Sequence, residues 1–522
     1  MPEDNARATA TATATEEEAT TTTTTTTSTS ASPSSGDFRS RFDAIRNDDC
    51  VVTSIEIRGN ERTKSSLIER ELRRVYEART LEGIKDALFL ANAALYEYGI
   101  FKDVAMVIDA DAAERHARLG EKDVPGAKVV VNVEEKDVFN FKAGTFMSRR
   151  GEGELELATG LRNPFGYGEK FELEYVRGAS SSSTYSALYE QPRLAGTDVS
   201  LDARVFQSLE CFKKLSSFNV TSRGMSLGLT GDGPATMEYT LAWREINDPT
   251  RMASRAVRKQ LGHSLKSSLT HVYVDDKLDR PVRPTSGYLW KLRNELAGIG
   301  LHSHAMATKF IKSEASAHAV TTLDEDKGIT ASLSGRLGLL LPWGSAGSGK
   351  GEDDTDDDVR TSIADRFFMG GVGCMRGFEN NGCGPSDERR AGGATTAEDD
   401  ASGVSPSLKR DALGGDFVWN LTAALQMDIP GEQFQAMRDA GIHFHAFASA
   451  GTLLPLSALS NASKSDVSRL LRQSTRASTG VGIVWPLPVG QIEINYGRVL
   501  SSASTDSVKN GFQVGIAAHV SM

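Results

Sequence analysis

The sequence has 522 residues, of which 39% are hydrophobic, and 59 Lys and Arg against 69 Asp and Glu give a formal net charge of −10. This acidic balance argues against a nucleic-acid binder, and the absence of any apolar run of 18 residues or more excludes a bundle of membrane-spanning helices. A transmembrane β-barrel stays compatible, because lipid-facing and lumen-facing residues alternate along each of its strands.

Residues 1–49 form a low-complexity segment rich in Thr and Ser, with an unbroken run from Thr21 to Thr27. Such a composition cannot bury a core, so we expect a disordered tail. The segment lacks both the apolar stretch of a secretory signal and the arginine-rich pattern of a transit peptide. We therefore expect no cleaved N-terminal address.

Residues 50–136 change in character and predict a small α+β domain. Apolar residues alternate in the strand-like parts, and they recur at helical spacing in two further stretches. The expected order is β-α-α-β-β, with a strand at 51–58, helices at 65–76 and 81–98, and strands at 104–108 and 129–133.

Residues 137–522 show almost no helical periodicity and predict β-structure throughout. In the C-terminal stretch Phe512, Val514 and Ile516 share one face, and Gln513, Gly515 and Ala517 share the other. A membrane strand needs about 9–11 residues plus a turn, so this length holds on the order of 16 strands. Two acidic, glycine-rich inserts near 344–360 and 385–411 are expected to be solvated loops.

Three other features look like sites but do not fulfil what the chemistry requires. The run Gly344 to Lys350 resembles a phosphate-binding loop, yet Gly351 stands where a magnesium-binding Ser or Thr is needed. The pairs His302/His304 and His443/His445 have no third ligand nearby, and the four cysteines are scattered. We expect no metal, no cofactor and no enzymatic activity, with a nucleotide hydrolase using Lys350 as the last alternative.

The segment Met375-Arg376-Gly377-Phe378 is the most informative motif. It resembles the Arg-Gly-Phe/Tyr signature in the long sixth loop of the β-barrel assembly family, whose members join POTRA domains to a 16-stranded outer-membrane barrel. The β-α-α-β-β unit is similar to one POTRA domain. Further matches occur in order at 279–287 (Asp-Arg-Pro through Pro-Thr-Ser-Gly), 413–416 (Leu-Gly-Gly-Asp) and 478–490 (Ser-Thr-Gly-Val-Gly leading into Pro-Leu-Pro-Val-Gly).

The resemblance covers residues 50–522 and implies a mostly β fold: a 16-stranded antiparallel transmembrane β-barrel preceded by one POTRA-like domain. A single POTRA domain and the missing export signal make the chain most similar to the mitochondrial sorting-and-assembly branch. This implies an insertase for β-barrel precursors in the mitochondrial outer membrane, with the POTRA-like domain toward the intermembrane space. Implied partners are unfolded precursors, membrane lipid and peripheral subunits of the sorting and assembly complex, without nucleic acid.

An insertase of this kind would work at a lateral seam between its first and last barrel strands, expected at 138–146 and 511–522. Parting these strands would expose unpaired N–H and C=O groups to an incoming strand. The predicted seam residues are Val138, Phe139, Asn140, Phe141, Gln513, Gly515, Ala518 and Val520.

Arg376 is expected to act as a structural latch that holds the long loop inside the lumen. A family motif on a late strand, Phe/Gly-x-Asp-x-Gly, would fall on residues 447–451, but Ser449 stands where the acid belongs. A buried arginine still needs a partner, because an unpaired charge costs several kcal/mol. Glu493, on the polar face of the penultimate strand, is the predicted partner.

Two alternatives of the same architecture remain open. A passive pore would conduct ions or metabolites but needs neither a POTRA-like domain nor an Arg-Gly-Phe loop. A protein-translocating barrel would pass chains through its lumen and not sideways into lipid.

Overall fold

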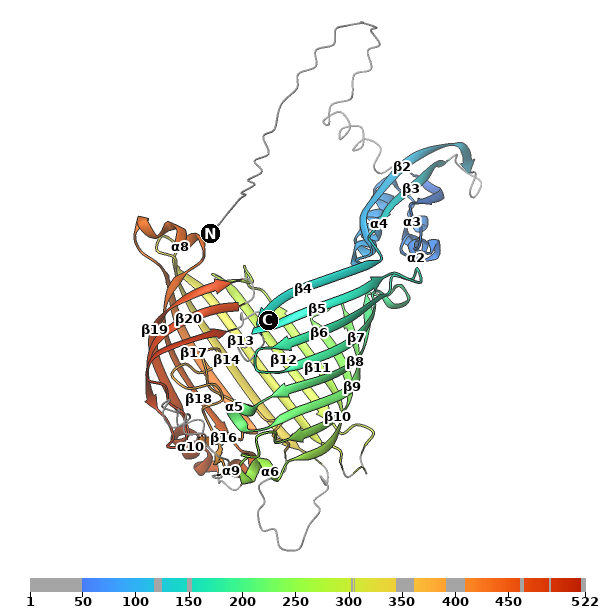
Figure 1. Ribbon diagram of the computed structural model, residues 1–522. Helices are drawn as coiled ribbons and strands as arrows, with labels where there is room; N and C mark the ends of the chain where they lie inside the picture. The colour runs from blue at the N-terminus through green and yellow to red at the C-terminus, as the bar shows by residue number, and fades with distance from the viewer. Residues whose placement is uncertain are drawn as a thin grey trace, which may run out of the picture.

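The computed structural model describes residues 49–116, 124–147, 153–301, 304, 306–343, 361–390, 409–460, 464–487 and 490–517. A small α+β domain stands at one rim of a large curved sheet, and the first and last strands of that sheet form its two edges (Figure 1). Within the described residues no helix is long and apolar enough to cross a membrane.

The N-terminal domain has the predicted β-α-α-β-β order, with its first predicted helix divided in two. The chain bends at Leu72 (φ −83°, ψ 0°), and Leu72 and Val75 both stay fully buried. Strand β3 lies between a parallel β1 and an antiparallel β2. The elements are β1 Val51–Arg58, α2 Ser65–Glu71, α3 Arg73–Glu77, α4 Leu81–Glu97, β2 Phe101–His116 and β3 Val124–Glu135.

The core of this domain forms where α2, α3 and α4 cover the three-stranded sheet. Ile68, Leu72, Ile84, Leu95 and Val131 are fully buried within one cluster. These residues recur at helical spacing or alternate along a strand, which is why the pattern could be read from the sequence.

The second unit is a sheet of 16 strands, as predicted, in which each strand is antiparallel to its sequence neighbour in the sheet. The strands are β4 Phe139–Met147, β5 Gly153–Arg162, β6 Lys170–Gly178, β7 Ser183–Gln191, β8 Val199–Cys211, β9 Asn219–Gly231, β10 Ala235–Asn247, β11 Gly262–Asp276, β12 Gly287–Ala297, β13 Phe310–Asp324, β14 Ile329–Pro342, β17 Phe417–Asp428, β18 His443–Leu454, β19 Arg476–Leu487, β20 Gly490–Ser501 and β21 Gly511–Ala517.

Short elements occupy the connections: η1 Leu194–Gly196, α5 Lys213–Ser216, α6 Arg255–Arg258, β15 Ser386–Glu388, β16 Arg410–Ala412, η3 Glu432–Phe434, α8 Gln435–Asp439, α9 Leu456–Ser460 and α10 Lys464–Gln473.

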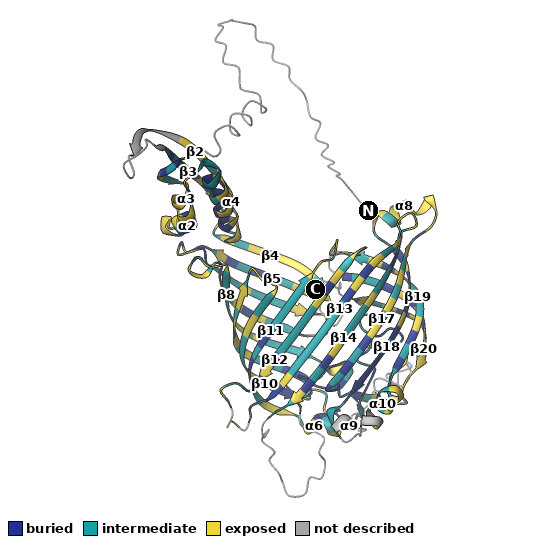
Figure 2. Ribbon diagram, turned by 180° about the vertical axis from the view of Figure 1, so that it is seen from behind, coloured by how far each residue is buried: buried dark blue, intermediate teal, exposed yellow. Residues whose placement is uncertain are grey.

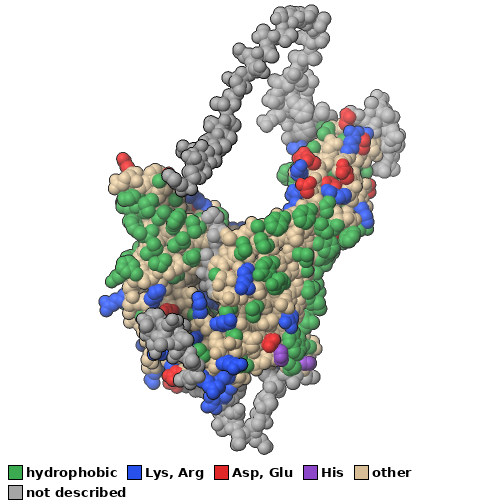
Figure 3. Space-filling view, in the orientation of Figure 1, with side chains coloured by type: hydrophobic (Ala, Val, Ile, Leu, Met, Phe, Trp, Pro, Cys, Tyr) green, Lys and Arg blue, Asp and Glu red, His purple; other side chains and the backbone are tan. Residues whose placement is uncertain are grey.

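Along the barrel strands exposed outer residues alternate with covered inner ones, as the burial colours show (Figure 2). In β21 the outward Phe512 is 73% exposed and the inward Gln513 only 5%. Apolar side chains accordingly gather over the outer face of the barrel wall (Figure 3). This alternation is the arrangement that a lipid-facing sheet requires.

Of the two inserts expected to be solvated loops, only the ends of the second are described. The first, near 344–360, lies outside the described residues. The two ends of the second pair as β15 and β16, and the Asp411 side chain is fully buried. That part of the prediction was wrong, because the carboxylate of Asp411 has hydrogen-bond donors that replace water.

Candidate functional site: the lateral seam and the loop that fills the lumen

The seam lies between β4 and β21, the two terminal strands of the sheet, which are not paired with each other over their described residues. Strand β4 begins at Phe139, one residue later than predicted, although Val138 O still accepts a hydrogen bond from Arg162 N (2.7 Å). The predicted seam residues Ala518 and Val520 lie outside the described residues.

The two edges of the seam differ in how well they are covered. Strand β4 is exposed at nearly every described position, with Phe139 and Phe141 at 64% and 63%. The predicted seam residue Asn140 is the half-buried exception between them. On β21, by contrast, the inward residues Gln513 and Ala517 are buried. An uncovered edge strand offers its backbone groups for pairing with another chain.

The cover on β21 comes from the long loop between β14 and β17. We call its residues 361–384 the lumen loop, because they contact the inner face of the barrel. Met375 and Phe378 are fully buried there, in a cluster with Phe367, Met369 and Leu453. The predicted motif thus lies at the centre of a second, smaller core inside the barrel.

Arg376 of the lumen loop makes the ion pair expected from the sequence. Its Nε and Nη2 each lie 2.7 Å from a different carboxylate oxygen of Glu493, on β20. The guanidinium carbon also lies 5.2 Å from the ring centroid of Phe447, on β18. The Arg376 cation is therefore held by a bidentate hydrogen-bonded pair and an aromatic face, the two contacts that suit guanidinium best.

The Glu493 carboxylate, which has no exposed surface, receives two further hydrogen bonds from its own strand. Gln491 Nε2 and Asn495 Nδ2 donate to its two oxygens at 2.7 and 2.8 Å. His445 Nε2 in turn contacts Asn495 Oδ1 at 2.5 Å. With four donors the carboxylate is fully satisfied, which is the condition for burying an ion pair without a large penalty.

Two glycines of the Ser-Thr-Gly-Val-Gly motif make room for this network. A Cβ at Gly480 would lie 2.8 Å from the Phe447 ring, and one at Gly482 would lie 2.2 Å from Asn495 Oδ1. Both glycines lie on β19, where Gly480 is paired with Phe447 and Gly482 with His445 and Asn495. Glycine is therefore required at these two positions of the motif, because other side chains approach the backbone closely there.

Gln513 joins the lumen loop to β21 through both ends of its amide. Its Oε1 accepts from Gly377 N and its Nε2 donates to Phe378 O, each at 2.9 Å. Gly377 has φ +84°, a conformation that favours glycine, and turns these two groups toward β21. We call this pair of contacts the Gln513 clamp.

Gly515, two residues further along β21, receives a side chain of the same loop. A Cβ at Gly515 would lie 2.4 Å from a methyl carbon of Val372. Gln513 and Gly515, predicted as seam residues, thus hold the loop on the inner face of the last strand.

Apart from His445, the remaining predicted features have no part in the latch. Ser449 shares a hydrogen bond of 3.0 Å with Thr422, so the missing acid is replaced from β20 and not on β18. His302 and the phosphate-loop-like run 344–350 lie outside the described residues, and among those described no group of His, Cys, Asp and Glu could hold a metal ion. All four cysteines are free.

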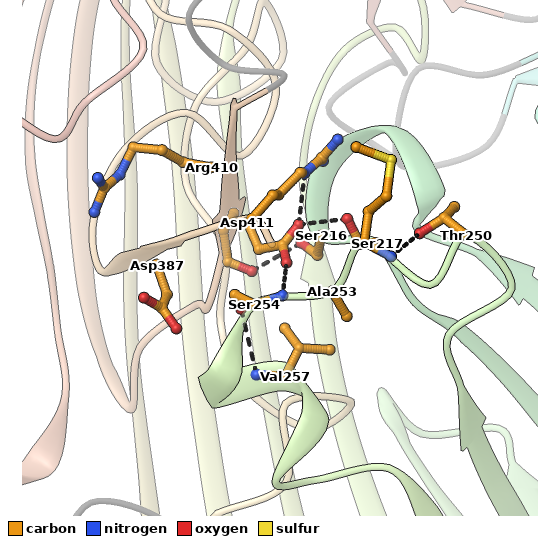
Figure 4. Close-up of polar contacts among 12 residues, drawn as sticks. Ser216, Ser217, Thr250, Ala253, Ser254, Val257, Asp387, Arg410 and Asp411 are labelled. Atoms are coloured by element: carbon orange, nitrogen blue, oxygen red, sulfur yellow. Dashed lines mark hydrogen bonds and ion pairs between the residues drawn. The ribbon is translucent and has the colours of Figure 1, made fainter. Parts of the chain in front are cut away.

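Sequence reasoning missed the contacts around Asp411, which lie toward the end of the barrel away from the N-terminal domain (Figures 1 and 4). Asp411 accepts from Ser217 Oγ (2.6 Å), Ser254 N (2.7 Å) and Arg389 Nε (2.8 Å). These donors come from the β8–β9 and β10–β11 connections and from the other arm of the insert. An isolated Asp in an acidic insert gives no signal of such burial.

The junction between the two units was also missed. On the barrel side, Asn163 of the β5–β6 turn donates to Thr63 Oγ1 (2.8 Å), and Arg193 binds Glu71 and Glu97 (3.2 and 2.6 Å). Tyr98 packs against Gly168, where a Cβ would lie 2.5 Å away, and burial raises the pKa of Tyr98 to about 12. The N-terminal domain is therefore fixed to the barrel rim by side chains as well as by the chain itself.

Comparison with known proteins agrees with this architecture. The Omp85 superfamily domain matches residues 163–519, and a POTRA model, described as surface antigen variable number repeat, matches 51–136. The chain is similar to the sorting and assembly machinery component 50 homologs of Bos taurus and Homo sapiens, at 29% identity over 90% of this chain and 90% of each relative.

Among solved structures, BamA from Haemophilus ducreyi lacking POTRA domains 1–3 matches with a TM-score of 0.67 at 19% identity, covering 89% of this chain and 84% of that one. At this identity the likeness concerns the fold. Because a family model covers well over half of the sequence, the chain belongs to the Omp85 superfamily, as a 16-stranded barrel with one POTRA domain.

Proposed function

We propose that this protein inserts β-barrel precursors into the mitochondrial outer membrane by templating their strands at the seam between β4 and β21. The names of its relatives, which are sorting and assembly machinery components, support a role in assembly. The observation that carries the mechanism is the uncovered edge of β4 beside a covered β21.

The physical need for a template follows from the membrane. Every backbone N–H and C=O of a spanning segment must be satisfied, so a single precursor strand cannot enter lipid unpaired. An edge strand of an existing barrel supplies the missing partners, and the side-chain alternation of the two strands fixes the register. The reaction breaks no covalent bond, and we propose a non-enzymatic role without metal or cofactor.

The difference between the two edges assigns them different roles. Strand β21 is held by seven residue pairs with β20 and by the Gln513 clamp on its inner side. Over the described residues, strand β4 is paired only with β5, and it carries two exposed phenylalanines on its outer face. We infer that β4 is the template strand and that β21 stays with the lumen loop when the seam opens.

We infer that the POTRA domain faces the intermembrane space and delivers precursors to this edge. Its last strand, β3, ends at Glu135, and β4 begins four residues later at Phe139. A precursor bound at the POTRA domain therefore needs to travel only a short distance along the chain to reach the template. Peripheral subunits of the assembly complex are further expected partners.

Depletion of the protein followed by timed assembly of labelled precursors into purified mitochondria tests the proposal, with helical outer-membrane and matrix proteins as controls. We expect barrel precursors to stall while the controls proceed. A stalled precursor should then crosslink to photoreactive groups at Phe139 and Phe141. Normal barrel assembly would refute the insertase, and crosslinks confined to lumen residues would favour translocation through the barrel.

A further inference from the structure

The lumen loop is held at a second place, on the wall opposite the seam. Strands β10 to β13 are the seventh to tenth of the sixteen, and we call their inner face the rear wall. Consecutive strands of this wall present Arg244, Lys266, Glu295 and Lys312 to the lumen, and Glu295 lies opposite Lys312 in the strand register. The three cations of this group contact Asp365, near the start of the lumen loop.

Asp365 is nearly inaccessible to solvent and, like Glu493, forms a bidentate pair with an arginine. Arg244 donates from Nη1 and Nη2 to its two oxygens at 2.8 and 3.0 Å, and both side chains are less than 10% exposed. Lys266 Nζ lies 3.3 Å from the same carboxylate and 2.6 Å from Glu295. A single loop carboxylate therefore joins two neighbouring strands.

The contacts continue through the next residues of the loop. Lys312 Nζ donates to the main-chain O of Asp365 at 2.6 Å and lies 4.6 Å from the ring centroid of Phe367. Arg336, on β14, lies 5.6 Å from the same ring. The rear wall thus holds Asp365 by its carboxylate, its carbonyl and the aromatic residue that follows.

We propose that Asp365 is a positioning residue for the seam. In this proposal the lumen loop is a strut with two fixed ends: Asp365 holds it at the rear wall, and Arg376 holds it at β20, next to the last strand. Only ten residues separate these two anchors. Between the two anchors Val372 of the loop contacts Gly515 of β21. A strut fixed at both ends keeps Val372 at this position along β21. Asp365 itself contacts neither β4, β20 nor β21 in the described part of the chain.

A disulfide between the strut and the last strand measures this position directly. In a variant without the four native cysteines, Val372→Cys and Gly515→Cys would be introduced together. A Cβ at Gly515 lies 3.2 Å from the Val372 Cβ, close to the roughly 3.5–4.5 Å of natural disulfides. We expect efficient crosslinking in this background and a several-fold lower yield after Asp365→Asn, with the folded barrel still detected by its heat-modifiable gel migration.

Asp202→Asn is the matched control, since Asp202 is another partly buried carboxylate facing inward, on β8, and its yield should stay high. Full crosslinking in Asp365→Asn would overturn the proposal. If that variant does not accumulate, Asp365→Glu keeps the charge but displaces the anchor by one methylene. The same loss of yield is then expected, and an undiminished yield counts against the strut.

The double variant Asp365→Asn with Arg244→Gln separates positioning from charge neutralisation. If Asp365 only neutralises a buried cation, removing that cation should restore the crosslink, and the proposal fails. If the pair is an anchor, the yield stays low. The consequence for precursor insertion rests on the proposed function: a lost crosslink combined with normal precursor assembly would retain the strut and show that insertion does not depend on it, whereas normal assembly after depletion of the protein would refute the insertase.

Discussion

Arg376 and Glu493 are joined by two hydrogen bonds of 2.7 Å, and Glu493 belongs to the strand that pairs with the last strand of the barrel. The acid that the family motif leads one to expect on β18 is replaced by Ser449. Moving the acid to β20 brings the ion pair next to the Gln513 clamp on β21. The latch and the clamp therefore hold one hairpin, β20–β21, as a unit.

Replacing Glu493 with Gln should destabilise the folded barrel by about 3–5 kcal/mol, because it leaves the buried Arg376 without its anion. Arg376→Lys should be less damaging but still harmful, since an ammonium cannot form the bidentate pair. Thermal or denaturant unfolding of the purified barrel measures both effects. Glu238→Gln, an exposed inward acid, is the control, and equal midpoints for Glu238→Gln and Glu493→Gln would contradict the latch.

Gln513→Glu tests the clamp on β21. A carboxylate can still accept from Gly377 N, but it cannot donate to Phe378 O, so one buried acceptor loses its donor at a cost of about 1–3 kcal/mol. We expect a lower unfolding midpoint and stronger protease cleavage within the lumen loop. Gln433→Glu, on the exposed η3 turn, should change neither quantity. If the Gln513→Glu protein has an unchanged unfolding midpoint and unchanged protease cleavage, the clamp does not stabilise the barrel.

Gly482→Ala should destabilise the network around Arg376, because its Cβ would lie 2.2 Å from Asn495 Oδ1 and 2.6 Å from Ile494 O. Overpacking of this kind costs about 1–3 kcal/mol. Gly228→Ala is the matched control: it is also an inward strand glycine, but its Cβ would meet only ordinary contacts at 3.5 Å or more. Similar unfolding midpoints for the two variants would show that the neighbours of Gly482 can shift to accept a Cβ without a cost in stability.

The sequence was sufficient for features that repeat or alternate. The β-strands follow from a period of two and their number from the length of residues 137–522, and Glu493 is predicted because it is the acid on the polar face of the penultimate strand. Strand borders shifted by one residue at β4, since the chain there leaves a POTRA strand without a turn signal. Local periodicity therefore predicts the strands of the barrel and the face on which Glu493 meets Arg376.

Contacts between segments far apart in the chain could not be read in the same way. Asp365 and Arg244 are separated by 121 residues, and nothing in either local pattern points to the other. Asp411 was expected in solvent because its neighbours are acidic and polar, yet three donors from three segments enclose it. Such pairs depend on how strands are ordered around the barrel, which a single sequence does not reveal.

The junction of the POTRA domain with the barrel should loosen at low pH. Burial raises the pKa of Glu135, but hydrogen bonds from Thr63 and Arg62 outweigh it, and the net shift is downward. A carboxyl with a lowered pKa stabilises the folded state above its unfolded pKa, about 4.3. That stabilisation is lost as the pH falls from there toward the lower, folded-state pKa. Thr63 is also the residue to which Asn163 of the barrel donates, so protonating Glu135 weakens the joint itself.

Distances between spin labels on α4 and on the β5–β6 turn measure this loosening. We expect a narrow distribution at neutral pH that broadens as the pH falls below the unfolded-state pKa of Glu135. Glu135→Gln cannot ionise, so its distribution should already be broad at neutral pH and should not respond further in this range. Glu134→Gln, at the adjacent exposed carboxylate, should behave like the native protein. A narrow, pH-independent distribution in the native protein would show that the joint does not depend on the charge of Glu135.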